Sequence, residues 1–267
     1  MKEVFFEERG IYYRANNLQS QLPTLVFIHG LSGSSSAWLP YEKVFEDRYN
    51  IISPDFRGHG KSRKRGRYND YAIENIADDL VRLLQHLRVQ ELIVIGHSFG
   101  TLIALSIIRQ LPGTKKVMFI SPTFKVENTW WLPVARVFVG VLYVFGPLFP
   151  FSTRPKRHVD YQKLTPTGDW SLRRIIPDIL NTGIRVYSYC LRHVWTRDFH
   201  PWWKGMEVPS LILHVEVDTV VPVRSAQMLS ELMPRAELRI IKEGNHILPV
   251  NNFKEVRDAI ELFSSTN

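Results

Sequence analysis

The stretch IVIGHSFGTLIAL (residues 93–105) decides the fold, because it sets one serine, Ser98, between Gly96 and Gly100 directly after an apolar run. The hydroxyl could simply cap a helix, or a tight turn could present it for chemistry. The residues before the turn are typical of a buried strand, and those after it of a buried helix. A glycine–X–serine–X–glycine match is weak alone. This context favours a catalytic role for the hydroxyl, since so tight a turn needs neighbours on either side without a Cβ atom, and Gly96 and Gly100 meet that need.

Strand-like runs alternate with helical patterns on both sides of this stretch. Each run is apolar and then turns polar or glycine-rich, as buried parallel strands do. The runs are TLVFIHG (24–30), NIISPDFRG (50–58), ELIVIGHS (91–98), KKVMFISP (115–122), PSLILHVEVD (209–218) and AELRIIKEG (236–244). Helical patterns cover residues 69–87, 99–111, 223–234 and 251–263. Asn69 or Asp70 is placed to cap the first of these helices.

The alternation breaks between residues 122 and 207, where the chain is rich in aromatic residues and proline. This segment contains every tryptophan except Trp38. The pattern predicts an α/β fold with a mostly parallel central sheet flanked by helices. Residues 1–121 and 208–267 would form the core, and residues 122–207 a helical cap inserted into it.

An apolar stretch inside the insertion, WWLPVARVFVGVLYVFGPLFPF (130–151), approaches the length of a membrane span. Arg136 lies inside it, and Pro133, Gly140, Gly146, Pro147 and Pro150 should interrupt any straight helix. These features favour a folded cap helix. A helix lying in a membrane interface and a true transmembrane helix are the alternatives.

Composition and charge limit the class of protein. Of 267 residues, 45% are hydrophobic and 22% are charged, as in globular proteins. The net charge is +8, and basic residues cluster at 57–67 and 154–158. Such runs are usually solvated loops, with attraction to anionic lipid or nucleic acid as the alternatives, and no nucleic-acid motif accompanies them. We therefore expect no nucleic-acid partner and allow peripheral contact with an anionic membrane.

The location of the protein is expected to be the cytoplasm. Cys190 is the only cysteine, so no intramolecular disulfide can form, which fits a reducing compartment. The first ten residues, MKEVFFEERG, are acidic where a signal peptide needs an uninterrupted apolar segment. The oligomeric state is left open.

Ser98 needs partners elsewhere in the chain, because a serine hydroxyl is a poor nucleophile until a base accepts its proton. A carboxylate must hold that base in the right tautomer. His246 is the best candidate base, since it follows a strand-like run and precedes the last helix. The side chain of His97 should point away from the hydroxyl. Asp218 ends a strand-like run and is the preferred acid, with Glu216 as its rival.

A tetrahedral oxyanion needs two hydrogen-bond donors that are already in place. One would be the backbone amide of Phe99, at the start of a helix, where the dipole also favours negative charge. The other would be the amide of Leu31, in the loop after the first strong strand. Gly30 and Gly33 would let that loop pass close to a substrate, with a simple glycine turn as the alternative reading.

These motifs resemble the α/β-hydrolase fold superfamily, of the capped kind that includes esterases, lipases and carbon–carbon bond hydrolases. They lie in the family's order of serine, acid and histidine: HGLSGSSSAW (29–38), PDFRGHGKS (54–62), GHSFG (96–100), EVDTVVP (216–222) and GNH (244–246). The resemblance implies Ser98 as nucleophile, Asp218 as orienting acid, His246 as base, and the amides of Leu31 and Phe99 as oxyanion donors.

A serine at the turn also narrows the chemistry, because haloalkane dehalogenases and epoxide hydrolases of this fold have an aspartate there. We expect a serine hydrolase that cleaves small carboxylic esters with an apolar acyl or alcohol group. No metal or cofactor is predicted, since no cysteine and histidine cluster has zinc-like spacing. One alternative is that the same triad serves amide or peptide cleavage, carbon–carbon hydrolysis, acyl transfer or cofactor-free peroxidation. Another is a non-catalytic ligand-binding or membrane-peripheral protein.

Overall fold

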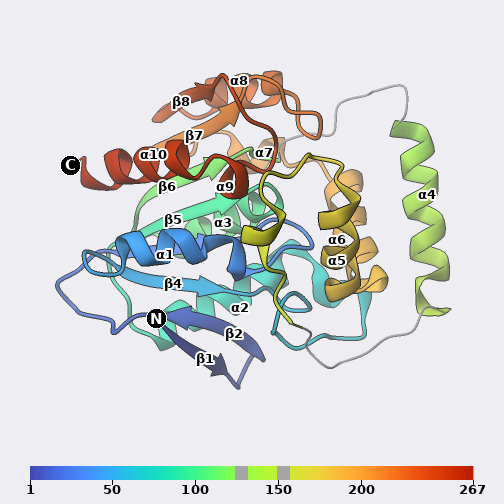
Figure 1. Ribbon diagram of the computed structural model, residues 1–267, viewed down its shortest axis with the longest axis horizontal. Coiled ribbons are helices and arrows are strands. Elements are labelled where there is room, and N and C mark those ends of the chain that lie inside the picture. Colours follow the sequence, from blue (N-terminus) through green and yellow to red (C-terminus); the bar gives the residue numbers. More distant parts are fainter. Residues whose placement is uncertain (124–131, 149–156, 267) are drawn as a thin grey trace.

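The computed structural model describes residues 1–123, 132–148 and 157–266 of the chain. At its centre is an eight-stranded sheet in the order β1-β2-β4-β3-β5-β6-β7-β8 (Figure 1). The strands are β1 (Lys2–Phe6), β2 (Ile11–Ala15), β3 (Thr24–Ile28), β4 (Asn50–Pro54), β5 (Leu92–His97), β6 (Thr114–Ile120), β7 (Ser210–Val215) and β8 (Ala236–Ile241). Neighbouring strands from β4 to β8 pair in parallel, whereas β1 and β2 form an antiparallel edge. The predicted fold class, a mostly parallel sheet flanked by helices with a helical insertion, is confirmed.

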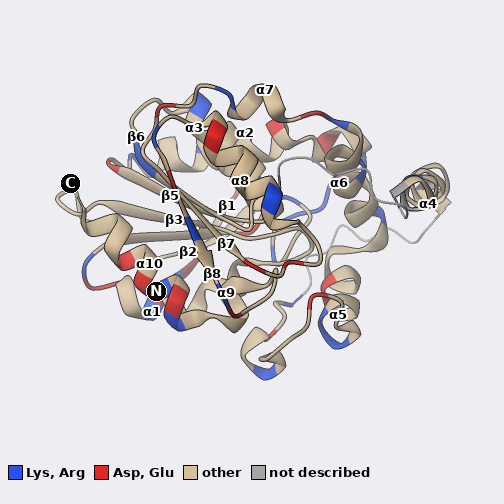
Figure 2. Ribbon diagram, turned by 90° about the horizontal axis from the view of Figure 1, so that it is seen from above, with Lys and Arg blue, Asp and Glu red and all other residues tan. Residues whose placement is uncertain are grey.

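Successive residues of β5 point to opposite faces of the sheet, which explains why both faces are covered. Ile93 and Ile95 lie in one buried cluster, and Leu92 and Val94 lie in the other. Three helices cover the first face: α1 (Leu39–Phe45), α9 (Leu248–Asn251) and α10 (Phe253–Ser265). Three cover the second: α2 (Ile73–His86), α3 (Phe99–Gln110) and α8 (Val223–Leu232). Viewed from above, the sheet is sandwiched between these two groups (Figure 2).

The start of α2 differs from the prediction. Asn69 and Asp70 do not cap this helix, because they belong to a separate 3₁₀ turn, η2 (Tyr68–Tyr71). The Asp70 carboxylate accepts a hydrogen bond from the backbone N–H of Arg67, so it caps that turn instead. Ala72 then occupies the N-cap of α2 without a side-chain bond. The predicted cap was wrong because a pattern of apolar spacing does not distinguish a 3₁₀ turn from the first turn of the helix.

Most helices of the chain between β6 and β7 stand to one side of the sheet, whereas the last of them lies over the sheet (Figures 1 and 2). These helices are α4 (Leu132–Phe145), α5 (Leu172–Thr182), α6 (Ile184–Thr196) and α7 (His200–Trp203). Tyr189 and Cys190 of α6 are buried in the same cluster as α2 and α3. Trp203 is fully buried, with its ring centroid 4.8 Å from that of Phe119 in β6. The inner part of the insertion is therefore packed into the core.

The apolar stretch predicted to be interrupted contains one continuous helix, α4, which passes through Pro133 and Gly140. Pro133 is tolerated because it is the second residue of the helix, where the missing N–H has no partner to lose. The helix ends at Phe145, and a 3₁₀ turn, η3 (Gly146–Leu148), follows. Pro150 lies outside the described residues. In the described parts of the chain, no helix combines the length and the apolar character needed to cross a membrane.

Candidate active site

Ser98 lies in the turn between β5 and α3, in a conformation that an L-residue rarely adopts. Its φ is 51° and its ψ is −121°, and close packing at the glycines on either side maintains these angles. A Cβ atom at Gly96 would come within 2.8 Å of the carbonyl oxygen of Gly100, and one at Gly100 would collide with the carbonyl oxygen of His29. Although Ser98 occupies the N-cap of α3, its side chain makes no capping hydrogen bond. The hydroxyl is thus left for another partner.

That partner is His246, which lies in the loop after β8. Its Nε2 is 2.8 Å from the Oγ of Ser98, and its Nδ1 is 2.7 Å from Oδ2 of Asp218. A carboxylate only accepts, so Nδ1–H donates to Asp218, and Nε2 of the neutral ring is free to accept from the serine hydroxyl. The structure therefore brings together three predicted residues from three separate loops, in the relay order of serine, imidazole and carboxylate.

Asp218 is held as a carboxylate at the start of the loop after β7. Its Oδ1 accepts hydrogen bonds from the backbone N–H groups of Val220 (2.8 Å) and Val221 (2.7 Å). Burial alone would raise the pKa of Asp218, but the hydrogen bond from His246 and these two amides outweigh burial and lower it. Asp218 thus keeps its negative charge beside the imidazole.

Two other histidines lie near this relay without entering it. Nε2 of His97 lies 2.9 Å from the backbone carbonyl of His246, to which it can donate, so its ring is turned to the histidine loop. Burial lowers the pKa of His97 to about 3, which keeps the ring neutral. His214 is fully buried, with Nε2 3.7 Å from Oδ2 of Asp218. Its Nδ1 lies 2.9 Å from both the backbone nitrogen and the carbonyl oxygen of Val215, so this ring nitrogen is engaged with the backbone of the next residue.

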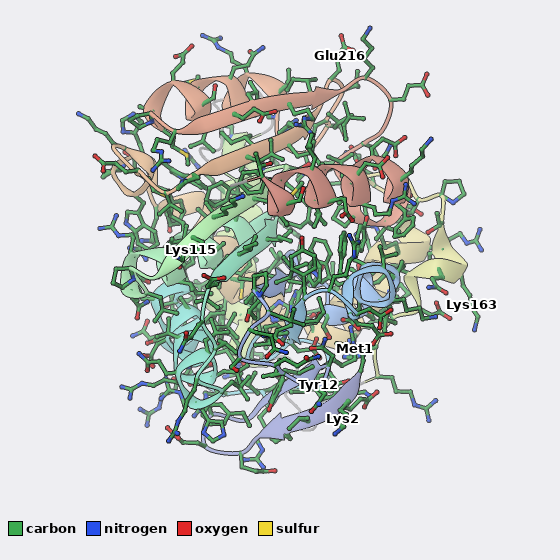
Figure 3. All side chains as sticks on the ribbon, turned by 90° about the vertical axis from the view of Figure 1, so that its left-hand side faces the viewer. Met1, Lys2, Tyr12, Lys115, Lys163 and Glu216 are labelled. Atoms are coloured by element: carbon green, nitrogen blue, oxygen red, sulfur yellow. The ribbon has the colours of Figure 1, made fainter. Side chains whose placement is uncertain are left out.

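The rival acid, Glu216, does not face His246. It is exposed, and it projects from the rim of the molecule in Figure 3. Its backbone N–H pairs with the carbonyl of Ile241, which continues the ladder between β7 and β8. Asp218, two residues further on, lies beyond the end of that ladder and turns inward.

The two predicted oxyanion donors lie at the ends of elements that meet at the serine turn. Phe99 is the first residue of α3, where backbone N–H groups have no acceptor within the helix. Leu31 follows the end of β3, in the loop that begins with His29 and Gly30. The close approach of Gly100 to the His29 carbonyl shows that this loop passes directly against the turn. Their role as oxyanion donors remains a prediction.

One residue that sequence reasoning missed, Asp169, joins the loops of the acid and the base. Its Oδ1 accepts the backbone N–H of His246 at 2.8 Å. Its Oδ2 accepts both the N–H (3.2 Å) and the hydroxyl (2.7 Å) of Thr219. Asp169 belongs to the insertion, between β6 and α5, and is largely buried. The insertion thus contributes directly to the positions of Asp218 and His246.

A second contact between the insertion and the histidine loop runs through Asn251. Its side chain accepts the N–H of Thr167 (2.9 Å) and donates to the carbonyl of the same residue (2.7 Å). Asn245, next to His246, donates to that carbonyl as well. Sequence reasoning had no signal for this pairing, because Thr167 and Asn251 are 84 residues apart.

Across residues 1–123, 132–148 and 157–266, there is no group of three or more His, Cys, Asp or Glu side chains arranged to hold a metal ion. The site brings a hydroxyl, an imidazole and a carboxylate into hydrogen-bonding contact, which are the groups that nucleophilic catalysis by serine uses.

The chain is similar to known proteins over most of its length. An uncharacterised hydrolase of Bacillus subtilis (strain 168), YugF, is 25% identical over 237 residues, which cover 85% of this chain and 84% of that protein. An esterase from Thermogutta terrifontis superposes with a TM-score of 0.72 at 19% identity, covering 95% of this chain and 93% of its own. An enol-lactonase from Burkholderia xenovorans LB400 superposes with a TM-score of 0.75 at 18% identity, covering 96% of each chain.

At these identities the two solved structures support the fold alone. The family model of the alpha/beta hydrolase fold matches residues 23–253, which extend from the start of β3 to the start of α10. Every residue of the serine, histidine and aspartate relay lies within that match. The chain therefore belongs to the alpha/beta hydrolase fold family.

Proposed function

We propose that this protein is a serine hydrolase that cleaves carboxylic esters through an acyl-enzyme. One observation carries the proposal: Ser98 Oγ lies 2.8 Å from His246 Nε2, whose Nδ1 lies 2.7 Å from Asp218. These separations are short enough for direct proton transfer, and the tautomer that Asp218 imposes is the one that can accept the serine proton.

The steps follow from these contacts. Ser98 Oγ attacks the acyl carbon while His246 Nε2 takes its proton, and Asp218 stabilises the imidazolium that forms. The amides of Phe99 and Leu31 would bind the oxyanion of the tetrahedral intermediate. Collapse of the intermediate breaks the bond to the alcohol, which leaves with the proton from His246. Water, deprotonated by the same imidazole, then attacks the acyl-enzyme, and Ser98 departs with the returned proton.

The acyl or alcohol group of the substrate would be apolar. Support comes from the rim of the Asp218 loop, where Val217 is 64% exposed and Val220 38% exposed. Trp170, from the insertion, is also exposed and donates a hydrogen bond from Nε1 to the hydroxyl of Thr219 in the same loop. Apolar side chains around a few fixed polar groups are typical of small-molecule sites.

Labelling with a fluorophosphonate probe tests the nucleophile. We expect the wild-type chain to be labelled and Ser98→Ala not to be. Ser230→Ala, which changes a half-buried serine on α8, should be labelled like the wild type. Labelling of Ser98→Ala at the wild-type rate would refute the proposal.

A panel of p-nitrophenyl esters of increasing chain length then tests the reaction. We expect turnover of some members with an initial burst that requires Ser98. Loss of His246 in His246→Ala should lower turnover by a factor on the order of 10⁴ or more, as removal of a triad member does elsewhere. If the probe labels Ser98 but no ester is hydrolysed, the same nucleophile serves a different acyl reaction.

A further inference from the structure

Exposed apolar side chains gather at one end of this molecule. Among the described residues, all large apolar side chains with high exposure lie in the insertion or in the loop of Val217 and Val220, except Met1, Val4, Met228 and Leu262. A soluble monomer ordinarily scatters such side chains singly, and a gathered set marks an interaction surface.

Helix α4 carries the largest share of them. Its exposed apolar residues recur every three or four positions, so that they form one stripe along the helix. They are Val134 (70% exposed), Val137 (68%), Phe138 (62%), Val141 (47%), Val144 (66%) and Phe145 (51%), and Leu148 (80%) follows in η3. We call these seven residues the α4 stripe.

The opposite face of α4 is anchored, which fixes the direction of the stripe. Val139 is 2% exposed, and the ring of Tyr143 packs edge-on against Tyr68 at 4.6 Å. The guanidinium of Arg192, from α6, lies 4.3 Å from the centroid of the Tyr143 ring. Because these contacts hold α4 against α6, the stripe faces away from the sheet. Figures 1 and 2 both place α4 at the outer end of the insertion.

Helix α5 adds apolar side chains beside basic ones. Leu172 (66% exposed) and Ile176 (49%) lie one turn apart, and the exposed Arg173 lies next to them. Lys163, in the preceding 3₁₀ turn, is 82% exposed along its side chain and projects from the molecule in Figure 3. Apolar residues bordered by lysine and arginine are the composition of helices that lie in a membrane interface.

The net charge of the insertion indicates the sign of the charge that its partner carries. Residues 122–207 contain twelve Lys and Arg against six Asp and Glu, so the insertion supplies +6 of the net charge of +8. Two of the six acids, Asp169 and Asp178, are buried and hydrogen-bonded inward. From residue 128 to residue 159, around α4, the sequence contains no acidic residue at all.

We propose that the α4 stripe docks on an anionic lipid bilayer, with α4 lying in the interface. The apolar stripe would enter the headgroup and acyl boundary, while Arg136, which is exposed on the same helix, would contact lipid phosphates. A second copy of this chain is disfavoured as the occupant, because it would set one cationic insertion against another. The proposal is independent of the esterase reaction, since it concerns a surface and not Ser98.

Vesicle flotation tests the docking. We use Ser98→Ala, so that no lipid can be hydrolysed, with vesicles of phosphatidylcholine alone or mixed in equal parts with phosphatidylglycerol. Binding should require phosphatidylglycerol and should be lost at 1 M salt, where the Debye length is about 3 Å. Arg136→Glu should weaken it by at least about fivefold. Lys115→Glu is the matched control, because Lys115 is exposed near the start of β6, and the starts of the parallel strands lie at the end of the sheet away from α4 (Figure 1; Lys115 is labelled in Figure 3).

The apolar part is tested with Phe138→Gln combined with Val141→Gln, which keeps good helix formers in α4. This double variant should lose most binding to the anionic vesicles. Leu262→Gln should keep it, although Leu262, on α10, is 57% exposed. Circular dichroism spectra matching those of the wild type would show that the variants are folded.

Site-specific labelling reports insertion directly and does not depend on lost binding. Cys190 is fully buried, so a thiol-reactive dye will favour a cysteine introduced at the surface. A polarity-sensitive dye on Val141→Cys should shift to the blue on addition of anionic vesicles, whereas the same dye on Leu262→Cys should not.

Three results would overturn the proposal. They are equal binding of wild type and the double variant to anionic vesicles, no binding to either vesicle, and a blue shift at Leu262→Cys as large as at Val141→Cys. A dimer in solution that the double variant abolishes, without vesicle binding, would instead identify the stripe as a contact between copies.

Discussion

At the scale of single residues, two carboxylates fix His246, and they do different work. Asp218 accepts a hydrogen bond from the Nδ1–H group of the ring and so sets the tautomer and the tilt of the imidazole. Asp169 accepts the backbone N–H of the same residue and so sets where the loop itself lies. We therefore expect proton transfer from Ser98 to depend on both, because a correct ring on a displaced backbone would lie too far from the hydroxyl.

Asp218 and Glu216 can be separated by kinetics. Asp218→Ala should lower kcat/KM for a p-nitrophenyl ester by about 10⁴-fold, because the imidazole loses the acceptor that fixes its tautomer. Glu216→Ala should keep most activity, since Glu216 is exposed and does not face His246. The reverse order would mean that the carboxylate seen at His246 is not the functional one.

Asp169 should behave as a positioning residue. Asp169→Ala removes three accepted hydrogen bonds, and we expect it to lower kcat by about 10- to 100-fold with little change in KM. Asp169→Asn keeps one oxygen acceptor and should lie between the alanine variant and the wild type. The rate of fluorophosphonate labelling should fall in parallel.

The control for this prediction is Asp160→Asn, a change at an exposed aspartate of the same insertion. It should leave both kcat and the labelling rate unchanged. If Asp169→Ala lost thermal stability but kept its kcat, Asp169 would hold the insertion in place without positioning the relay.

At the scale of elements, the sequence predicted those helices, strands and turns that are determined by residues close together in the chain. The strand, turn and helix around Ser98 are local, since two glycines and two apolar runs determine them. The antiparallel edge formed by β1 and β2 was not predicted, because three of the five residues of β1 are exposed and show no buried pattern. Asp169 was missed for a different reason: its partner His246 is 77 residues away, and no local pattern encodes such a contact.

Asp178 lies where helix α5 meets the 3₁₀ turn η4 (Tyr161–Leu164). Its contribution to the free energy of unfolding should depend on pH. Burial raises the pKa of Asp178 to about 6, although hydrogen bonds from Tyr161 and Arg174 oppose the rise. The folded state holds the proton of this carboxyl more tightly than the unfolded state does. The free energy of unfolding therefore falls as pH rises from about 4 through 6. Asp178→Asn should therefore be more stable than wild type by about 2 kcal/mol above pH 7. The two should differ little below pH 4.

Urea denaturation at a series of pH values measures this difference. Asp160→Asn is again the control and should follow the wild-type curve at every pH. Wild type and Asp178→Asn with the same pH dependence would show that Asp178 does not titrate in this range.

At the scale of the whole molecule, the insertion has two sides with opposite properties. Its inner side, with Tyr189, Cys190 and Trp203, is buried in the cluster that covers one face of the sheet. Its outer side carries the α4 stripe and most of the net charge. Asp169 connects the insertion to the loops of Asp218 and His246. A contact at the outer side is therefore linked to the loops of Asp218 and His246 through the packed elements of the insertion.

The division into a core (1–121 and 208–267) and a cap (122–207) stays a prediction, and unfolding can test whether the cap is an independent unit. Every tryptophan except Trp38 lies in residues 122–207, so fluorescence mainly reports the insertion, whereas far-ultraviolet circular dichroism reports the whole chain. Because Trp203 is fully buried against Phe119, we expect the two signals to change together.

Trp203→Ala should lower the free energy of unfolding by about 3–5 kcal/mol, whichever of the two signals is used to measure it. Trp170→Ala, at a tryptophan that is 63% exposed, should lower it by less than about 1 kcal/mol. Two separate transitions, with Trp203→Ala shifting only the fluorescence, would instead make the insertion a domain that folds by itself.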